Sequence, residues 1–143
     1  SVEFQVRTIA DRKMAPLDQV ASGGELSRIS LAVQVVTSAI DSVPSCIYDE
    51  VDIGIGGRIA EIVGGKLREL GKERQILCIT HLPQVAVQGS GHLLVTKTGE
   101  SGLNIHTLDP HSRTEEIARM LGGIQITQQT RAHAEEMLQK ATA

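Results

Sequence analysis

The chain has 143 residues, of which 41% are hydrophobic, and its 14 Lys and Arg against 17 Asp and Glu give a formal net charge of -3. This length suits one domain or a piece of one, with a core that is aliphatic because the aromatic residues are only Phe4 and Tyr48. These properties exclude a broad basic surface for DNA, an aromatic platform for bases, and an apolar run long enough to span a membrane.

The first part of the chain predicts a strand, a helix and a second strand. Val2–Arg7 alternates apolar and polar residues, as in a half-buried strand. From Gly24 onward, apolar residues recur every three or four positions, which predicts an amphipathic helix. Its expected inward residues are Leu26, Ile29, Val33, Val36 and Ile40. Pro44 then interrupts the chain before the short strand Cys46–Tyr48.

The middle of the chain continues this alternation. A turn at Gly54–Gly57 leads into a helix that ends at Gly71. Its expected inward residues are Ile59, Ile62, Val63, Leu67 and Leu70. Gln75–Thr80 is a continuous aliphatic strand, as expected where both faces of a sheet are covered. Cys46 and Cys78 lie in these strands without a CxxC spacing, so we expect reduced thiols in a reducing cytoplasm.

The last part of the chain predicts a hairpin and helices. The elements are a short helix near Pro83, a hairpin of His92–Thr98 and Leu103–Leu108, and helices at Arg113–Leu121 and about Gln128–Lys140. Strands that alternate with helices predict an α/β fold. We therefore expect a central, mostly parallel sheet flanked by helices, followed by a C-terminal hairpin and two helices.

Two adjacent carboxylates, Asp49 and Glu50, follow the strand Cys46–Tyr48. In an α/β sheet the carboxyl end of a central strand opens onto the ligand crevice. Acids at this place suit Mg²⁺ binding and the activation of a water molecule. The alternative is a pair of solvated acids at a strand end, and the residues alone favour the two interpretations equally.

A glycine-rich stretch, Ser22–Glu25, comes at the start of the first predicted helix. Consecutive glycines leave backbone amides unshielded there, and the helix dipole favours an anion. Ser22 and Glu25 also have the spacing of a capping box, so an ordinary capped helix is the alternative. His81 closes the aliphatic strand and could donate to a phosphate oxygen, although a single histidine is more often structural.

The chain contains no GxxxxGK[ST] phosphate loop. Gly54–Ile59 starts like a dinucleotide fingerprint, but Ile59 occupies the place of the third glycine. The chain therefore has groups that could handle metal and water, but it lacks the main cradle for a triphosphate. It also starts at Ser1 and runs directly into strand-like sequence, so we expect a segment of a longer polypeptide.

Taken together, these motifs resemble the SMC-like family of ABC-type ATPases, and within it the RecN proteins of bacterial DNA repair. The glycine-rich stretch resembles the ABC signature motif, Cys46–Glu50 the Walker B strand, and His81 the switch histidine. Glu25 stands where transporters usually carry Gln. The stretches that carry the RecN resemblance are Ala21–Arg28, Asp49–Ile55, Thr80–Ala86 and Glu116–Leu121.

The resemblance implies that residues 1–143 form the C-terminal lobe of an ATPase head. The Walker A loop would lie in an N-terminal lobe, which a long coiled coil separates from this one. Two heads would enclose ATP and Mg²⁺ as an ATP-dependent homodimer. The implied roles are Mg²⁺ binding through water for Asp49, polarisation of the attacking water for Glu50, and a γ-phosphate contact for His81. The implied contacts to ATP on the opposite head are Ser22, Gly23, Gly24 and Glu25. The D-loop stretch, Gly54–Gly57, lacks the usual Asp, which leaves Asp52 as the candidate for a nucleotide contact across the heads.

The leading hypothesis is therefore an ATPase of DNA double-strand break repair and recombination, with DNA bound by the full-length protein in the bacterial cytoplasm at the nucleoid. The lobe alone should hydrolyse no ATP and should expose an aliphatic sheet edge that invites self-association. One alternative is a non-catalytic assembly module derived from such a head. A transporter nucleotide-binding domain is another, against which Glu25 argues.

Overall fold

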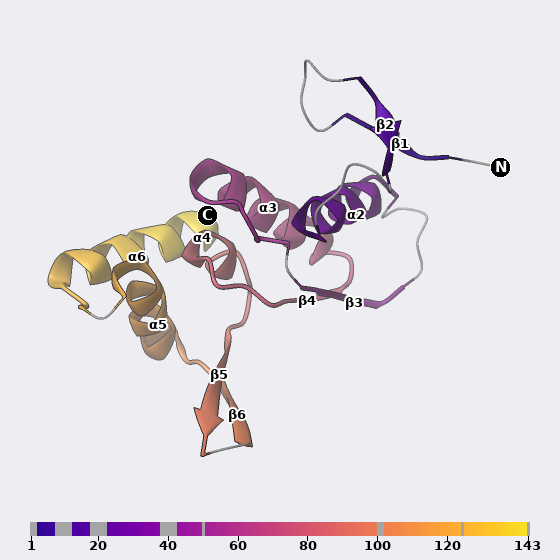
Figure 1. The fold of residues 1–143 in the computed structure, drawn as a ribbon. Coiled ribbons are helices and arrows are strands. Elements are labelled where there is room, and N and C mark those ends of the chain that lie inside the picture. Colours follow the sequence, from indigo (N-terminus) through magenta and orange to yellow (C-terminus); the bar gives the residue numbers. More distant parts are fainter. Residues whose placement is uncertain are drawn as a thin grey trace.

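The computed structural model describes residues 3–7, 13–17, 23–37, 43–49, 51–99, 102–123 and 125–142. Within these ranges the strands form three two-stranded sheets. Figure 1 shows that the helices α2, α3 and α4 lie on one side of the middle sheet, with the helices α5 and α6 at one end and a hairpin projecting from the body. No helix among the described residues has the length and apolar character to cross a membrane.

A parallel β–α–β unit forms the centre of the fold. Strand β3 (Ser45–Tyr48) pairs in parallel with β4 (Gln75–Cys78), and helix α3 (Gly57–Leu70) connects them. The Ile79 N–H donates to the Tyr48 carbonyl at 2.9 Å, which extends the pairing to the end of β4. Parallel strands need such a crossover connection. This unit confirms the predicted α/β class with parallel central strands.

The helix α2 (Gly23–Thr37) packs on this unit through a different face from the predicted one. Leu31 is buried and Val35 is partly buried against the core, whereas Leu26 and Val33 are exposed and Val36 is 83% exposed. Ile29 is half-buried, and Ile40 lies outside the described residues. The prediction was wrong because α2 is apolar on more than one side, so its periodicity did not single out the face that is buried.

The predicted face of α3 was also partly wrong. Val63, Leu67 and Leu70 are buried as expected, but Ile59 and Ile62 are exposed. The buried stripe instead includes Ala60 and Gly64, whose small size allows α3 to approach the short helix α4 (Pro83–Ala86). Gly71 ends α3 as predicted, with its N–H donating to the Leu67 carbonyl at 2.9 Å.

The middle sheet is covered on one face only. Cys46, Tyr48 and Ile76 point toward the helices and belong to the first core or pack against it. On the other face, Ile47 is 71% exposed and Ile79 is 60% exposed. The expectation that both faces are covered was therefore wrong for the described residues. The run Gln75–Thr80 is continuously aliphatic because the outer face of the middle sheet is also apolar, although no described residue covers that face. Both cysteines are free, as predicted.

The remaining elements form a second core and two hairpins. Helices α5 (Pro110–Gly122) and α6 (Gln128–Thr142) pack against each other and the end of α4. The members of this core are Val87, Ile117, Ala118, Ala134 and Ala141. Strands β5 (Leu93–Thr98) and β6 (Gly102–Thr107) form the predicted hairpin. Near the N-terminus, β1 (Gln5–Val6) pairs antiparallel with β2 (Ala15–Pro16).

Candidate functional site

The candidate site lies at the carboxyl ends of β3 and β4. Because these strands are parallel, their carboxyl ends lie at the same edge of the sheet. Asp49 follows β3 directly and its side chain is exposed. Thr80 and His81 follow β4 at the same edge. The structure thus brings together two of the segments that the sequence predicted to cooperate.

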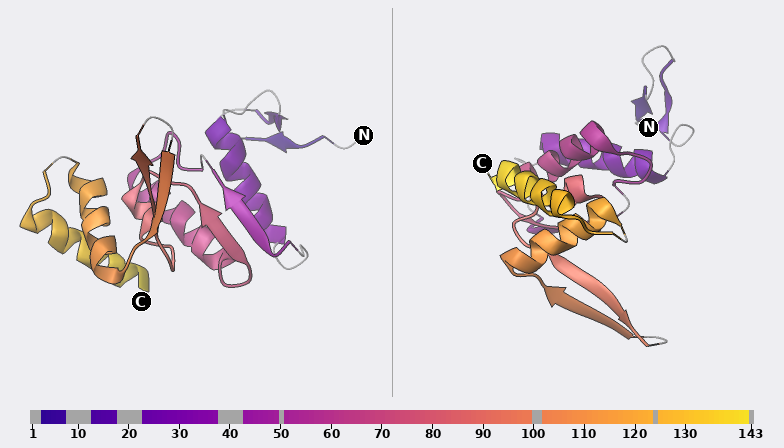
Figure 2. Two further views of the ribbon diagram at one scale, coloured as in Figure 1. Left: turned by 90° about the horizontal axis from the view of Figure 1, so that it is seen from below. Right: turned by 90° about the vertical axis from the view of Figure 1, so that its left-hand side faces the viewer.

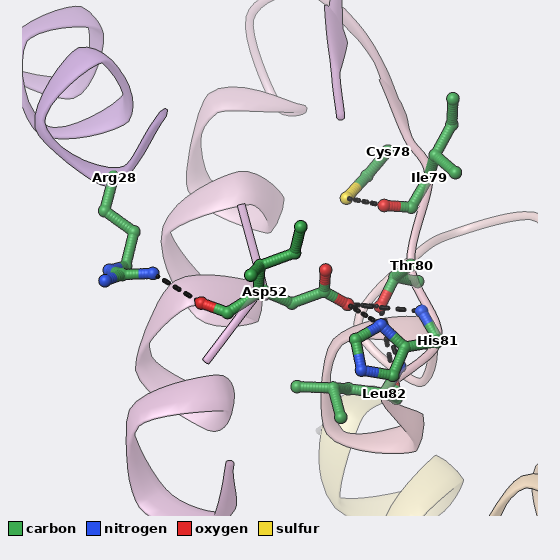
Figure 3. A network of polar contacts seen from close by, with 8 residues as sticks. Arg28, Asp52, Cys78, Ile79, Thr80, His81 and Leu82 are labelled. Carbon is green, nitrogen blue, oxygen red and sulfur yellow. Dashed lines mark hydrogen bonds and ion pairs between the residues drawn. The ribbon is translucent and has the colours of Figure 1, made fainter. Parts of the chain in front are cut away.

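Asp52 is the centre of the polar network at this edge (Figure 3). Asp52 lies in the turn after β3 and is only 2% exposed. Its Oδ2 accepts the Thr80 hydroxyl at 2.5 Å and the His81 backbone N–H at 3.2 Å, and lies 3.4 Å from the His81 Nδ1. A buried carboxylate needs such partners, because an unpaired buried charge is costly. Asp52 therefore holds the end of β4 to the turn after β3.

His81 itself is accessible, since 69% of its side chain is exposed. Its local backbone is fixed by Thr80, whose Oγ accepts the Leu82 N–H at 3.0 Å. The Asp52 contact comes from the inner side of this turn, so the imidazole is held near a buried carboxylate while much of its surface remains open. His81 can therefore contact an external ligand while it keeps its contact with Asp52.

A second link joins α2 to the same region. The Arg28 guanidinium donates from Nη1 to the Ile53 carbonyl at 2.9 Å (Figure 3). Ile53 directly follows Asp52, and Val51, which directly precedes Asp52, is fully buried. The turn Val51–Gly54 ends at Gly54, whose φ of 71° favours glycine. Contacts from both α2 and β4 therefore fix the segment that carries Asp52.

The carboxylates also influence a neighbouring thiol. Burial, and then the negative charges of Asp52 and Asp49, raise the pKa of Cys78 to about 11. The influence of both charges on one side chain indicates that the two carboxylates occupy the same electrostatic neighbourhood. No group of three or more potential metal-binding side chains occurs among the described residues.

The other predicted site residues have mixed outcomes. Gly23, Gly24 and Glu25 lie in the first turn of α2, where the prediction put a helix N-terminus. Ser22 and Glu50 lie outside the described residues, so their predicted roles stay predictions. Sequence reasoning assigned no role to Thr80 or Arg28. In the sequence, Thr80 is visible as a hydroxyl directly before His81 and Arg28 as an arginine six positions after Ser22. Neither position indicates which group the side chain bonds to.

Several known proteins are similar to this chain. Proteins named DNA repair protein RecN from Xylella fastidiosa and Vibrio cholerae are each 50% identical over 141 residues, and that from Bacillus subtilis is 41% identical over 143 residues. The matches cover 96–98% of this chain but only 25–26% of those proteins, so the chain spans about a quarter of their length. No protein-family model matches the chain.

A solved structure has a similar fold. It comes from work on ATP-driven dimerization and DNA-stimulated activation of SMC ATPases, and its TM-score is 0.60 at 16% sequence identity. The match covers 81% of this chain and 71% of that chain. The described elements therefore have the fold of part of an SMC ATPase head.

Proposed function

We propose that the chain is the C-terminal lobe of an SMC-like ATPase head of the RecN type, since proteins named DNA repair protein RecN match nearly all of it and it spans about a quarter of their length. The full-length protein would bind and hydrolyse ATP in bacterial DNA double-strand break repair and recombination. The observation that carries this proposal is the network at the ends of β3 and β4. There the Asp52 carboxylate accepts hydrogen bonds from Thr80 and His81. Arg28 on α2, the helix that carries the signature stretch, donates to the carbonyl of Ile53, the residue after Asp52.

The site residues have distinct roles in this proposal. The exposed Asp49 carboxylate suits Mg²⁺ held through water, since hard cations prefer oxygen ligands. Glu50, the next residue, would polarise the attacking water, and the accessible His81 ring would contact the γ-phosphate. Bound Mg²⁺ would neutralise charge on the phosphates. These groups would position the γ-phosphate and polarise the attacking water. Positioning and charge stabilisation are the main requirements of phosphoryl transfer.

The signature stretch would serve a second head. Gly23, Gly24 and Glu25 form the first turn of α2, where backbone amides and the helix dipole favour an anion, and Ser22 precedes them in the sequence. We propose that they contact ATP held by the opposite head of a homodimer. DNA would bind elsewhere in the full-length protein, since this chain has a net charge of -3 and no broad basic field.

The uncovered sheet surface suits the missing N-terminal lobe. The exposed Ile47, Leu77 and Ile79 lie on the outer face of β3 and β4. Among the described residues β4 pairs only with β3, and Figure 2 shows the β5–β6 hairpin on the other side of β4. An exposed apolar surface with a free strand edge is a site for association. We propose that the lobe with the Walker A loop covers this surface and completes the sheet.

ATP turnover by the full-length protein tests the proposal. Glu50→Gln should lower kcat by about 10²–10⁴-fold, as expected for loss of a general base, and should accumulate ATP-dependent dimers. Glu61→Gln changes an exposed carboxylate on α3 in the same way and serves as the control. ATP turnover in Glu50→Gln equal to that of the control would remove Glu50 from the mechanism.

A further inference from the structure

We propose that Asp52 is a positioning residue for His81 and does not itself contact the nucleotide. This inference rests on the proposed function, because it takes His81 as the γ-phosphate contact. It replaces the nucleotide contact across the heads that the family resemblance implied for Asp52. The reason is accessibility: Asp52 is 2% exposed and its Oδ2 is occupied by groups of this same lobe.

A single oxygen atom of Asp52 holds the backbone and the ring together. Oδ2 accepts from the Thr80 hydroxyl and from the His81 N–H, which fixes the backbone on both sides of the Thr80–His81 peptide bond. The same oxygen lies 3.4 Å from the His81 Nδ1. Figure 3 shows the three dashed lines converging on this atom. A positioned imidazole needs its backbone and its ring restrained together, and Asp52 restrains both.

The contact at Nδ1 also selects the tautomer of the ring. A carboxylate next to one ring nitrogen favours the proton on that nitrogen, and this determines the state of the other nitrogen. In the neutral ring, Nδ1 would carry the proton and Nε2 would keep its lone pair. Nε2 is thus the ring nitrogen left for a ligand, and it can donate to a phosphate oxygen only when the ring carries a proton on both nitrogens.

Asp52 can do this because its own backbone is fixed from two sides. Val51 is fully buried in the first core, and the Ile55 N–H donates to the Asp52 carbonyl at 3.4 Å. The Arg28 bond to the Ile53 carbonyl ties the adjacent peptide to α2. His81 is therefore connected through Asp52 to the helix that carries the signature stretch. Engagement of that helix by a second head would act on a segment that holds His81.

The first test separates hydrogen-bond acceptance from negative charge. In the full-length protein, Asp52→Ala should lower kcat for ATP by about 10- to 100-fold, because a misplaced catalytic group loses alignment, and KM should change by less than about threefold. Asp52→Asn should keep kcat within about threefold of the parent, since an amide oxygen can accept the same bonds. A direct metal or nucleotide contact predicts instead that Asn is as damaging as Ala and that KM rises.

Thr80 supplies a second pair of variants, which decides the question if Asp52→Ala does not fold. Thr80→Val keeps the shape but removes the hydroxyl that Asp52 accepts, so kcat should fall by about 3- to 30-fold. Thr80→Ser keeps the hydroxyl and should restore most of kcat. Equal kcat in Thr80→Val and Thr80→Ser would overturn the proposal.

A spectroscopic measurement makes the inference independent of turnover. In the full-length protein with ¹⁵N-labelled histidine, the neutral His81 ring should carry its proton on Nδ1. Asp52→Ala should abolish this preference, and Asp52→Asn should retain it. If the protein hydrolyses no ATP, the proposed function fails, but this measurement still decides the role of Asp52. An unchanged His81 tautomer in Asp52→Ala would overturn the inference.

Discussion

The residues at the end of β4 act on one another through charge and burial. Cys78 is the clearest case, since burial and the nearby Asp52 and Asp49 raise its pKa to about 11. At neutral pH its thiol is therefore almost entirely protonated, and only the thiolate reacts with alkylating agents. A thiol in this environment is a poor nucleophile at neutral pH.

This protonation predicts slow alkylation of Cys78. At pH 7.5 the native chain should react with iodoacetamide at Cys78 about 100-fold more slowly than the denatured chain, and the rate should rise about tenfold per pH unit up to pH 10. Asp52→Asn should accelerate the native reaction, because it removes one of the charges that raise the pKa of Cys78. Mass spectrometry of the labelled peptide gives the rate. A native rate equal to the denatured rate would contradict the burial and charge argument.

Asp109 is a second residue whose charge has a local structural effect. It is the N-cap of α5, and its carboxylate accepts the Ser112 N–H and the Ser112 hydroxyl, each at 2.9 Å. These bonds to the charged form lower the pKa of Asp109, the backbone bond contributing most. The stabilisation is therefore present above the ordinary carboxyl pKa and is lost as the pH falls through the lowered pKa.

The cap predicts a pH-dependent stability difference. Asp109→Ala should lower the melting temperature at pH 7, and Asp109→Asn should lower it less, because an amide oxygen still caps the helix. The difference between the parent and Asp109→Ala should shrink from about pH 4 downward, as the Asp109 carboxylate is protonated. Thermal unfolding of these variants between pH 7 and pH 3 measures it. A difference that stays constant over this range would show that the ionised cap contributes nothing.

At the scale of the element, α3 contains two adjacent glycines in different environments. A Cβ on Gly64 would lie 2.8 Å from the Gln88 Cγ, 3.1 Å from the Gln84 carbonyl oxygen and 3.2 Å from the Val85 Cα. A Cβ on Gly65 would meet nothing within 4 Å. The side chain of Gln88 could move, but the backbone of α4 could not move without disturbing the core around Val85. Gly64 is therefore required for the close approach of α3 and α4.

This contrast gives a matched pair of substitutions in one helix. Gly65→Ala should stabilise the protein by about 0.5–1 kcal/mol, since alanine is the better helix former. Gly64→Ala gains the same propensity but should be destabilising overall by about 1–3 kcal/mol, because it overpacks the contact with α4. Urea unfolding of both variants measures the difference. Equal stabilisation by the two substitutions would mean that α3 and α4 are not packed this closely.

The same helix explains which parts of the fold the sequence could predict. The boundaries of α3 followed from Gly57 and Gly71, and the pairing of β3 with β4 followed from the alternation of strands and helices. The buried face followed only in part, because its stripe also contains Ala60 and Gly64, which carry little hydrophobic signal. The apolar Ile59 and Ile62 suggested a different face, and in this chain they are exposed.

The candidate site was predictable to a similar extent. Parallel strands bring their carboxyl ends together, so the nearness of Asp49 and His81 could be expected from the order of the elements. The buried bond from Thr80 to Asp52 could not, because it depends on the turn at Gly54 and on side-chain orientation. The family resemblance left Asp52, two residues after Glu50, as the candidate for a nucleotide contact, and the structure buries it.

At the scale of the whole molecule, Arg113 ties α5 to the end of α4, which lies between the two cores. Arg113 on α5 donates through Nη2 to the Ala86 and Val87 carbonyls, each at 3.2 Å, and to the Gly89 carbonyl at 2.6 Å. These carbonyls belong to the end of α4 and the residues after it, which need partners at a helix C-terminus. The site at the end of β4 is thereby held to the α5–α6 pair as well as to α2 and α3.

The exposed outer face of the middle sheet gives the last prediction. Residues 1–143 expressed alone should self-associate with rising concentration, because Ile47 and Ile79 expose an apolar surface beside a strand edge that no other described strand pairs with. Ile47→Lys should weaken this association by at least about tenfold. An unpaired charge that is buried in an apolar contact between copies loses its hydration, which costs several kcal/mol. Gln139→Lys adds the same charge at an exposed position of α6 and should have no effect. Sedimentation velocity over a concentration series measures the association. A monomer at every concentration, or equal association of the two variants, would mean that this surface does not drive contact between copies.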